Sequence, residues 1–127
     1  MRFMTGNAAR WVAGVQSAYF ISTGLWPVLH LSSFLSVTGP KHDLWLMQAF
    51  GLLVCAQGAA LLFAFIGRRA LQALPFGVSS AAMLAVIDVW FVASGDIGRV
   101  YLLDAGAEAL LVASWLIVQR RRMAEQH

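Results

Sequence analysis

Cysteine is almost absent from this chain of 127 residues, which contains Cys55 alone. A single cysteine cannot form an intramolecular disulfide, and it cannot supply a cysteine-based metal cage or an iron–sulfur cluster. Cys55 lies within an apolar run, where a free cysteine is usually a small buried residue. Charge is scarce as well, because Asp, Glu, Lys and Arg together make up 12% of the residues. The chain is therefore neither a disulfide-stabilised domain nor a highly charged one.

The basic residues are few and dispersed. Nucleic-acid-binding proteins usually gather their Lys and Arg on one surface or along one helix. Here the net charge is only +3, and the nine Lys and Arg are scattered between apolar blocks. We expect no nucleic-acid partner.

Apolar residues, in contrast, make up 60% of the chain, more than a soluble domain of this length can bury in one core. A membrane-spanning helix needs about 20 mainly apolar residues. Four blocks meet this requirement, at residues 11–31, 44–66, 71–93 and 100–118. The connections between them are short and carry Gly, Pro or charge. The sequence predicts one all-α domain over residues 1–127, a four-helix bundle embedded in a membrane.

The distribution of Lys and Arg predicts the orientation of this bundle. With four spans, the N-terminus, the second connection and the C-terminus lie on the same side of the membrane. That side contains seven arginines, which are Arg2, Arg10, Arg68, Arg69, Arg120, Arg121 and Arg122. The other side contains only Lys41 and Arg99. Because basic residues are enriched in cytoplasmic loops, both termini are expected in the cytoplasm.

Three carboxylic acids, Asp88, Asp104 and Glu108, lie inside the apolar blocks. An ionisable side chain in hydrocarbon costs roughly 2.5 to 3.5 kcal/mol on insertion scales, so such residues usually mark functional sites. At a rise of 1.5 Å per residue they lie about 7, 6 and 12 Å below the outer membrane surface, respectively. Lipid cannot satisfy them, so we expect them to face one polar pocket in the outer half of the bundle.

Other polar residues fall at the same depth. A polar stripe with helical spacing runs along the first block and ends at His30, and Pro27 is expected to bend or break that helix just before the histidine. Arg99 and the loop at 41–43 are expected to cap the pocket. The candidate residues for binding a ligand or a proton are His30, Asp88, Asp104, Glu108, Arg99, Tyr19, Trp26 and Gln48.

Simpler explanations exist for several of these residues. One buried acid can be structural, forming an interhelical hydrogen bond worth about 0.6 to 2 kcal/mol. His30 with two or three carboxylates is a reasonable ligand set for iron, manganese or zinc, but no spacing motif such as HExxH accompanies it. We therefore predict no metal site, and the sequence indicates no cofactor. The tryptophans at positions 11, 45, 90 and 115 are expected to form an interfacial aromatic belt.

Three short motifs carry a resemblance: TGLWPVLH at 23–30, VTGPK at 37–41 and YLLD at 101–104. With them the chain resembles a group of small bacterial four-helix membrane proteins that are known mainly as uncharacterised sequences. This resemblance implies the bacterial inner membrane and no particular activity. In architecture the chain is also distantly similar to the DoxX-like proteins and to the EXPERA group of sterol isomerases and sigma-2-type receptors. The EXPERA similarity implies ammonium pairing or proton shuttling at carboxylates such as Asp88, Asp104 or Glu108.

Three functions fit these observations. The first is a protein that binds or transports a small cationic or amphipathic ligand, or protons, through the acidic pocket. The second is a lipid-modifying enzyme of the isomerase type, in which one carboxylic acid donates a proton and a neighbouring carboxylate removes one. The third is an accessory subunit whose acids are neutralised by Arg99 and Lys41, and whose small residues pack against a protein partner or a second copy. Membrane lipid is an expected partner in all three.

Overall fold

The computed structural model describes residues 2–39 and 43–125 of the protein, with side chains from residue 5 onward. This part of the chain is mainly helical and contains no strand, so the all-α prediction is confirmed. Its elements are α1 (Arg2–Leu29), α2 (Leu31–Thr38), α3 (Leu44–Ile66), the 3₁₀ helix η1 (Ala70–Ala73), α4 (Leu74–Ala93) and α5 (Tyr101–Glu125).

Three of these segments are long and apolar enough to cross a membrane: α3, η1 together with α4, and α5. A fourth crossing is obtained if α1 and α2 are counted as one bent span. Large apolar side chains such as Leu53, Phe63 and Leu110 are exposed on the outer surfaces of these helices. The chain thus has the helix lengths and the apolar exterior of a multi-pass membrane protein.

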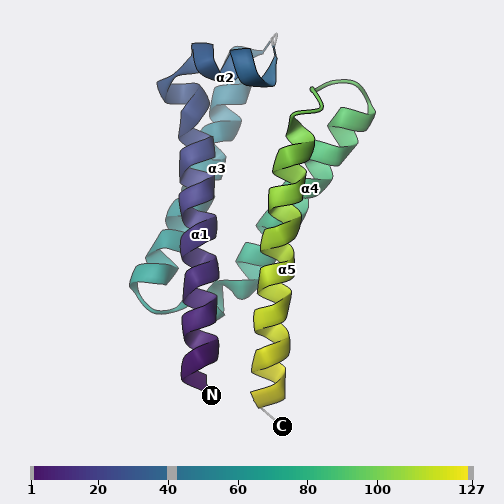
Figure 1. Ribbon diagram of the computed structural model, residues 1–127. Helices are drawn as coiled ribbons and strands as arrows, with labels where there is room; N and C mark the ends of the chain where they lie inside the picture. The colour runs from purple at the N-terminus through teal and green to yellow at the C-terminus, as the bar shows by residue number, and fades with distance from the viewer. Residues whose placement is uncertain (1, 40–42, 126–127) are drawn as a thin grey trace.

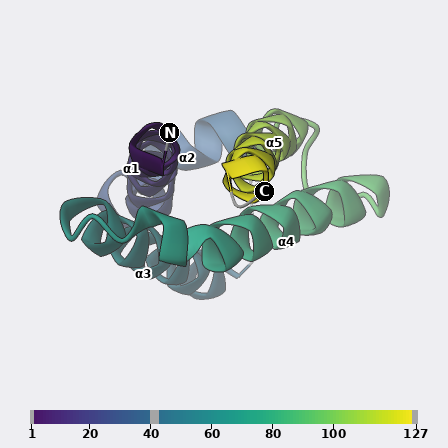
Figure 2. The ribbon, with the colours of Figure 1, turned by 90° about the horizontal axis from the view of Figure 1, so that it is seen from below.

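The helices form two pairs, α1 with α3 and α4 with α5, and α1 also packs against α5. Viewed along the helices, α1 and α5 lie on one side of the molecule and α3 and α4 on the other (Figure 2). The pairs are close together at the end that carries both termini, and they diverge toward the opposite end, where α2 lies (Figure 1).

Glycines set the distance between helices within each pair. A Cβ atom on Gly24 of α1 would lie 2.4 Å from the carbonyl oxygen of Gly51 on α3, so the two backbones touch at this crossing. On α4, a Cβ atom on Gly77 would lie 2.4 Å from the indole nitrogen of Trp115 on α5. Small residues at such crossings are typical of helix packing in membranes.

The helix ends differ from the sequence prediction in several places. The first helix begins at Arg2 instead of 11, and the last extends to Glu125 instead of 118. Both extensions lie outside the apolar blocks but are rich in good helix formers such as Arg, Ala and Glu, so the helices continue. The third predicted helix, at 71–93, begins as η1 and becomes α-helical at Leu74.

The bend predicted near Pro27 is present, and it falls at His30. Proline lacks the backbone N–H that would continue the hydrogen-bond ladder, and α2 leaves the axis of α1 at an angle of 108°. Residues 32–43 were expected to form a loop between the first two helices. This prediction was wrong for most of the segment, because it contains α2.

Candidate functional site

A cavity of about 340 Å³ lies between the two helix pairs, at the end of the molecule where they diverge. All five α-helices contribute to its walls. Most of the lining is apolar, aromatic or glycine, and the polar groups are three carboxylic acids, two tyrosines and two threonines. No Lys, Arg or His lines it among the residues that the structure describes. An apolar cavity with a few converging polar groups is the usual form of a ligand-binding site.

The structure brings Asp88, Asp104 and Glu108 together on this cavity. Asp88 comes from α4 and is 6% exposed, whereas Glu108 comes from α5 and is 1% exposed. One turn before Glu108, Asp104 is partly buried. The carboxyl groups of Asp88 and Asp104 are within hydrogen-bonding reach of each other, and Glu108 is close enough to both to interact electrostatically. The four-residue spacing on α5 thus places both of its acids on the face that meets α4.

These carboxyl groups are incompletely paired. The hydroxyl of Tyr19, on α1, donates a hydrogen bond to Oδ1 of Asp104. In contrast, Oδ2 of Asp88 and Oε2 of Glu108 are buried and have no hydrogen-bond partner among the described residues. Leaving a buried polar atom unpaired is costly, more so if it is charged. Two residues of the cavity wall therefore each have a buried oxygen that no described group of the protein satisfies.

His30 does not join the acids, contrary to the expectation from its depth. It is exposed at the end of α1 and caps α2, and its Nδ1 lies 2.7 Å from Oγ of Ser33 and accepts the Ser33 N–H at 3.3 Å. Ser33 belongs to the first turn of α2, so the imidazole satisfies a backbone donor that the helix leaves free. In this position the imidazole of His30 caps α2.

The cations expected to cap the pocket are also absent from the described site. Arg99 is exposed just before α5, and within the described ranges it forms no ion pair with an acid. Lys41 lies outside the described residues. The acids are therefore not neutralised by the part of the chain that the structure describes.

Trp26 and Gln48 hold the bent end of α1 in place. Trp26 lines the cavity, donates from Nε1 to Oγ of Ser33 at 2.8 Å, and packs edge-on against Phe34 with ring centroids 5.3 Å apart. Gln48 does not line the cavity, because its amide donates to the carbonyl oxygen of Pro27 at 3.2 Å. That carbonyl has lost its helical partner where α1 ends, and Gln48 replaces it.

Several lining residues were not predicted. Phe34 and Thr38 reach the cavity from α2, and Tyr101 reaches it from the first turn of α5. Tyr101 forms a side-chain hydrogen bond with Thr38, which links α2 to the other helix pair. The YLLD motif places Tyr101 one turn before Asp104, so its helical spacing was a usable signal. Nothing in the sequence indicated that α2 turns back over the cavity.

The tryptophans are only partly interfacial. Trp11, Trp45 and Trp90 are largely exposed, as an aromatic belt requires, but Trp115 is fully buried. Its Nε1 donates to Oε1 of Gln16 at 2.6 Å, and the Gln16 amide donates to the carbonyl oxygen of Gly77 at 3.0 Å. The belt prediction is wrong for Trp115, because Gly77 provides the space for its ring in the core.

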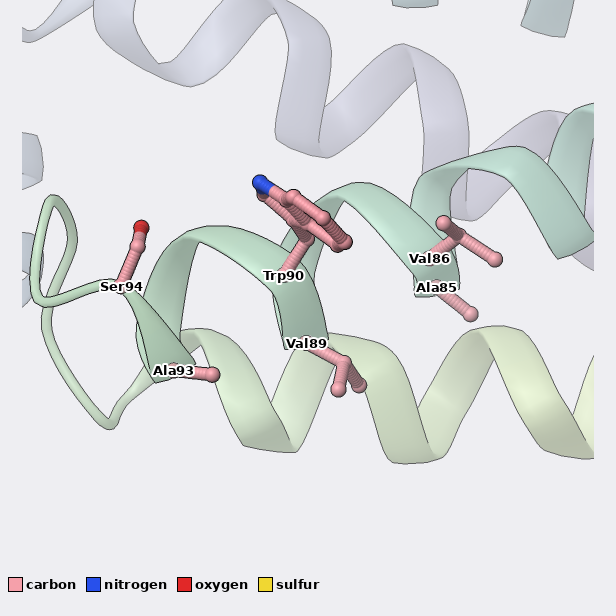
Figure 3. A pocket seen from close by; sticks show the side chains of 6 residues that line it. All are labelled: Ala85, Val86, Val89, Trp90, Ala93 and Ser94. Atoms are coloured by element: carbon pink, nitrogen blue, oxygen red, sulfur yellow. The ribbon is translucent and has the colours of Figure 1, made fainter.

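A second hollow, of about 590 Å³, lies on α4 alone (Figure 3). Ala85, Val86, Val89, Trp90, Ala93 and Ser94 line it. These side chains lie on the side of α4 away from the buried residues Leu84 and Asp88. Lipid can cover such an apolar face, and we assign no site to it.

The described side chains include no group of three or more His, Cys, Asp and Glu placed to hold a metal ion. Fold and site together define a class: an all-helical protein with helices long and apolar enough to span a membrane and with an internal acidic cavity. No protein family, no curated protein and no solved structure matches the chain.

Proposed function

We propose that this chain is a four-helix protein of the bacterial inner membrane that binds a small cationic or amphipathic ligand, or a proton, in the acidic cavity. In this proposal α1 and α2 together form one of the four spans, and both termini are cytoplasmic. The seven arginines on the side of the termini support this orientation. The acids then lie in the outer half of the membrane, and the ligand reaches them from the outer side.

The observation that carries the proposal is the set of buried carboxyl groups without a basic partner. Asp88 and Glu108 line a cavity of about 340 Å³, and each has a buried oxygen without a partner among the described residues. A buried carboxylate requires a counter-charge or a proton, since desolvation penalises it strongly. A cationic ligand or a proton supplies the group that is missing.

The cavity walls indicate the rest of the ligand. Phe50 and Val54 from α3 and Leu84 from α4 give the cavity an apolar surface. Burying an apolar group there yields roughly 25 cal/mol for each Å² removed from water. A molecule with an apolar body and a cationic head satisfies both parts of the cavity.

An isomerase-type enzyme is the alternative that a specific contact favours. Asp88 and Asp104 within hydrogen-bonding reach of each other could act as proton donor and acceptor for a lipid-like substrate. The architectural resemblance to the EXPERA group points the same way. The role of an accessory subunit has less support, because it does not explain the buried carboxyl oxygens that lack a partner.

The test is a matched pair of cavity and surface variants. The protein is purified in lipid nanodiscs, and N,N-dimethylbenzylamine is titrated while thermal unfolding is followed. We expect the amine to stabilise the parent protein, by about 2.7 kcal/mol at one hundred times its Kd. Val54→Phe should abolish this stabilisation, because Val54 is 8% exposed and lines the cavity.

Leu53→Phe is the control, because Leu53 is 66% exposed on the outer face of the same helix. It adds the same ring without entering the cavity and should bind the amine as the parent does. No stabilisation of the parent protein, or equal stabilisation of the Val54→Phe variant, would contradict the proposal.

A further inference from the structure

The number of charges in the cavity decides which cation it can accept. Three ionised carboxylates in one low-dielectric space would repel one another strongly. No described basic side chain lines the cavity to offset that repulsion. The ionisable groups that face the acids are Tyr19 from α1 and Tyr101 from α5, and the lining residues of α2 and α3 include none. The acids must therefore reduce their own charge by holding protons.

Asp104 differs from the other two acids in its contacts. Its Oδ1 accepts the hydrogen bond from the hydroxyl of Tyr19, and its carboxyl group is within hydrogen-bonding reach of Asp88. Two carboxylates are both acceptors, so a hydrogen bond between them requires a proton on one of the two. If that proton is on Asp88, Asp104 accepts from both neighbours, and donated hydrogen bonds stabilise a carboxylate.

Glu108 is in a different situation. It is 1% exposed, and its Oε2 has no partner among the described residues. An ionised carboxylate this deeply buried needs hydrogen bonds or a counter-charge. As a neutral acid Glu108 needs no counter-charge, and it keeps an O–H that can donate to a ligand or to a neighbouring carboxylate.

We propose that the resting cavity holds a single negative charge, on Asp104, with protons on Asp88 and Glu108, and therefore selects ligands with one positive charge and an apolar body. The proposal rests on the proposed function and specifies its ligand class. Such a monocation neutralises the cavity without displacing a proton. The aromatic rings of Tyr19, Trp26 and Phe34, which also line the cavity, are suited to contact a cationic head.

Three probes of related shape test how many positive charges a ligand of the cavity carries. Benzyltrimethylammonium carries one permanent charge, neopentylbenzene is its neutral carbon analogue, and p-xylylenebis(trimethylammonium) carries two charges. Because none of them titrates, any proton exchanged on binding comes from the protein or the medium. In nanodiscs, we expect the monocation to bind at least about tenfold more tightly than either of the others.

Calorimetry in two buffers of different ionisation enthalpy counts the protons. If the proposal is correct, the heat of binding of benzyltrimethylammonium is the same in both buffers near pH 7. Release of about one proton per cation would mean that the resting cavity is neutral, and it would overturn the proposal. This measurement uses the parent protein and does not depend on whether any variant folds.

Substitutions then test which of the three acids carries the negative charge. Asp104→Asn should weaken binding of the monocation by about 30-fold or more, as expected when one partner of a buried charge pair is lost. Asp88→Asn and Glu108→Gln keep a polar N–H in place of the acid O–H and should weaken it by less than about tenfold. Asp96→Asn is the control, because Asp96 is exposed in the connection between α4 and α5.

The outcomes separate this proposal from the one before it. If the parent protein binds none of the three probes, both fail. If it binds the monocation but Asp88→Asn or Glu108→Gln is as damaging as Asp104→Asn, the cavity still binds cations and the assignment of the single charge is wrong. Tighter binding of the dication would lead to the same conclusion.

Discussion

Polar side chains in the interior of the molecule form two layers along α1. The upper layer is Tyr19 with Asp104, and the lower layer, one turn away, is Gln16 with Trp115. The amide of Gln16 uses both of its ends, because it accepts from Trp115 and donates to Gly77. In the upper layer, by contrast, buried carboxyl oxygens stay unpaired. Complete pairing in the lower layer fits a structural role, and incomplete pairing in the upper layer fits a binding site.

The hydrogen bond from Tyr19 to Asp104 leads to a prediction about stability. Tyr19→Phe keeps the ring but removes the hydroxyl that donates to Asp104. Because a hydrogen bond to a charged group contributes about 1.5 to 3 kcal/mol, we expect a loss of stability of that size in the absence of ligand. Thermal unfolding in nanodiscs measures it.

Ser114→Ala provides the comparison. This half-buried serine on α5 only donates to the carbonyl oxygen of Leu110, one turn earlier on the same helix. Its loss should change the free energy of unfolding by less than about 0.5 kcal/mol. If Tyr19→Phe is equally harmless, the hydroxyl does not stabilise Asp104.

At the scale of elements, α3 was predicted with its observed bounds, because a continuous apolar run ends at Asp43 on one side and Gly67 on the other. The ends of α1 and α5 could not be predicted in this way. Hydropathy locates the part of a helix that lies in hydrocarbon, whereas these helices continue into polar sequence. The cost of burying acids was enough to place Asp88, Asp104 and Glu108 together.

The prediction for His30 failed for a reason that lies in α2. A histidine at membrane depth near three acids is equally compatible with a ligand-binding residue and with a helix cap. The difference depends on the 108° bend, which carries the imidazole onto the N-terminus of α2. The same bend brings Phe34 and Thr38 to the cavity, so these lining residues were not predictable either.

Replacing glycine by alanine should change stability in opposite directions at two positions, one at the crossing of α1 and α3 and one on the surface of α5. Gly51→Ala adds a methyl group 2.5 Å from the carbonyl oxygen of Gly24, so the two helices must separate, at a cost of about 1 to 3 kcal/mol. Gly106→Ala, in contrast, meets nothing within 4 Å and lies within the exposed surface of α5.

Alanine favours a helix over glycine by about 0.5 to 1 kcal/mol, so the Gly106 variant should be more stable than the parent protein. Thermal unfolding of both variants under the same conditions is the measurement. If Gly51→Ala also stabilises the protein, α1 and α3 do not make backbone contact at this crossing.

For the molecule as a whole, the cavity follows from how the two helix pairs meet. Near the termini, small residues such as Ala9 and Ala13 are fully buried, and Thr5 donates a hydrogen bond to Glu125 across the ends of α1 and α5. The pairs separate toward α2, where larger aromatic residues and the acids line the space between them. The two helix pairs lie closer together at the end that carries the termini than at the end that carries α2 (Figure 1).

The membrane topology is the prediction that tests this arrangement. Both termini lie at one end of the molecule, the end that carries most of the arginines (Figure 1). In a Cys55→Ala background, single cysteines are placed at Asn7, Asp96 and Ala124, which are all exposed. A membrane-impermeant maleimide should label position 96 in intact spheroplasts, and positions 7 and 124 only after permeabilisation, because basic flanking segments stay in the cytoplasm.

Each contradictory pattern has its own meaning. Labelling at position 7 from outside would show that α1 and α2 do not form a span, which leaves three crossings and places the N-terminus outside. Labelling at 7 and 124 but not at 96 would invert the protein. The acids would then lie in the inner half of the membrane, where their cavity would accept its ligand from the cytoplasmic side. Labelling at position 96 alone would indicate that α1 is part of a span and that the cavity lies toward the outer surface.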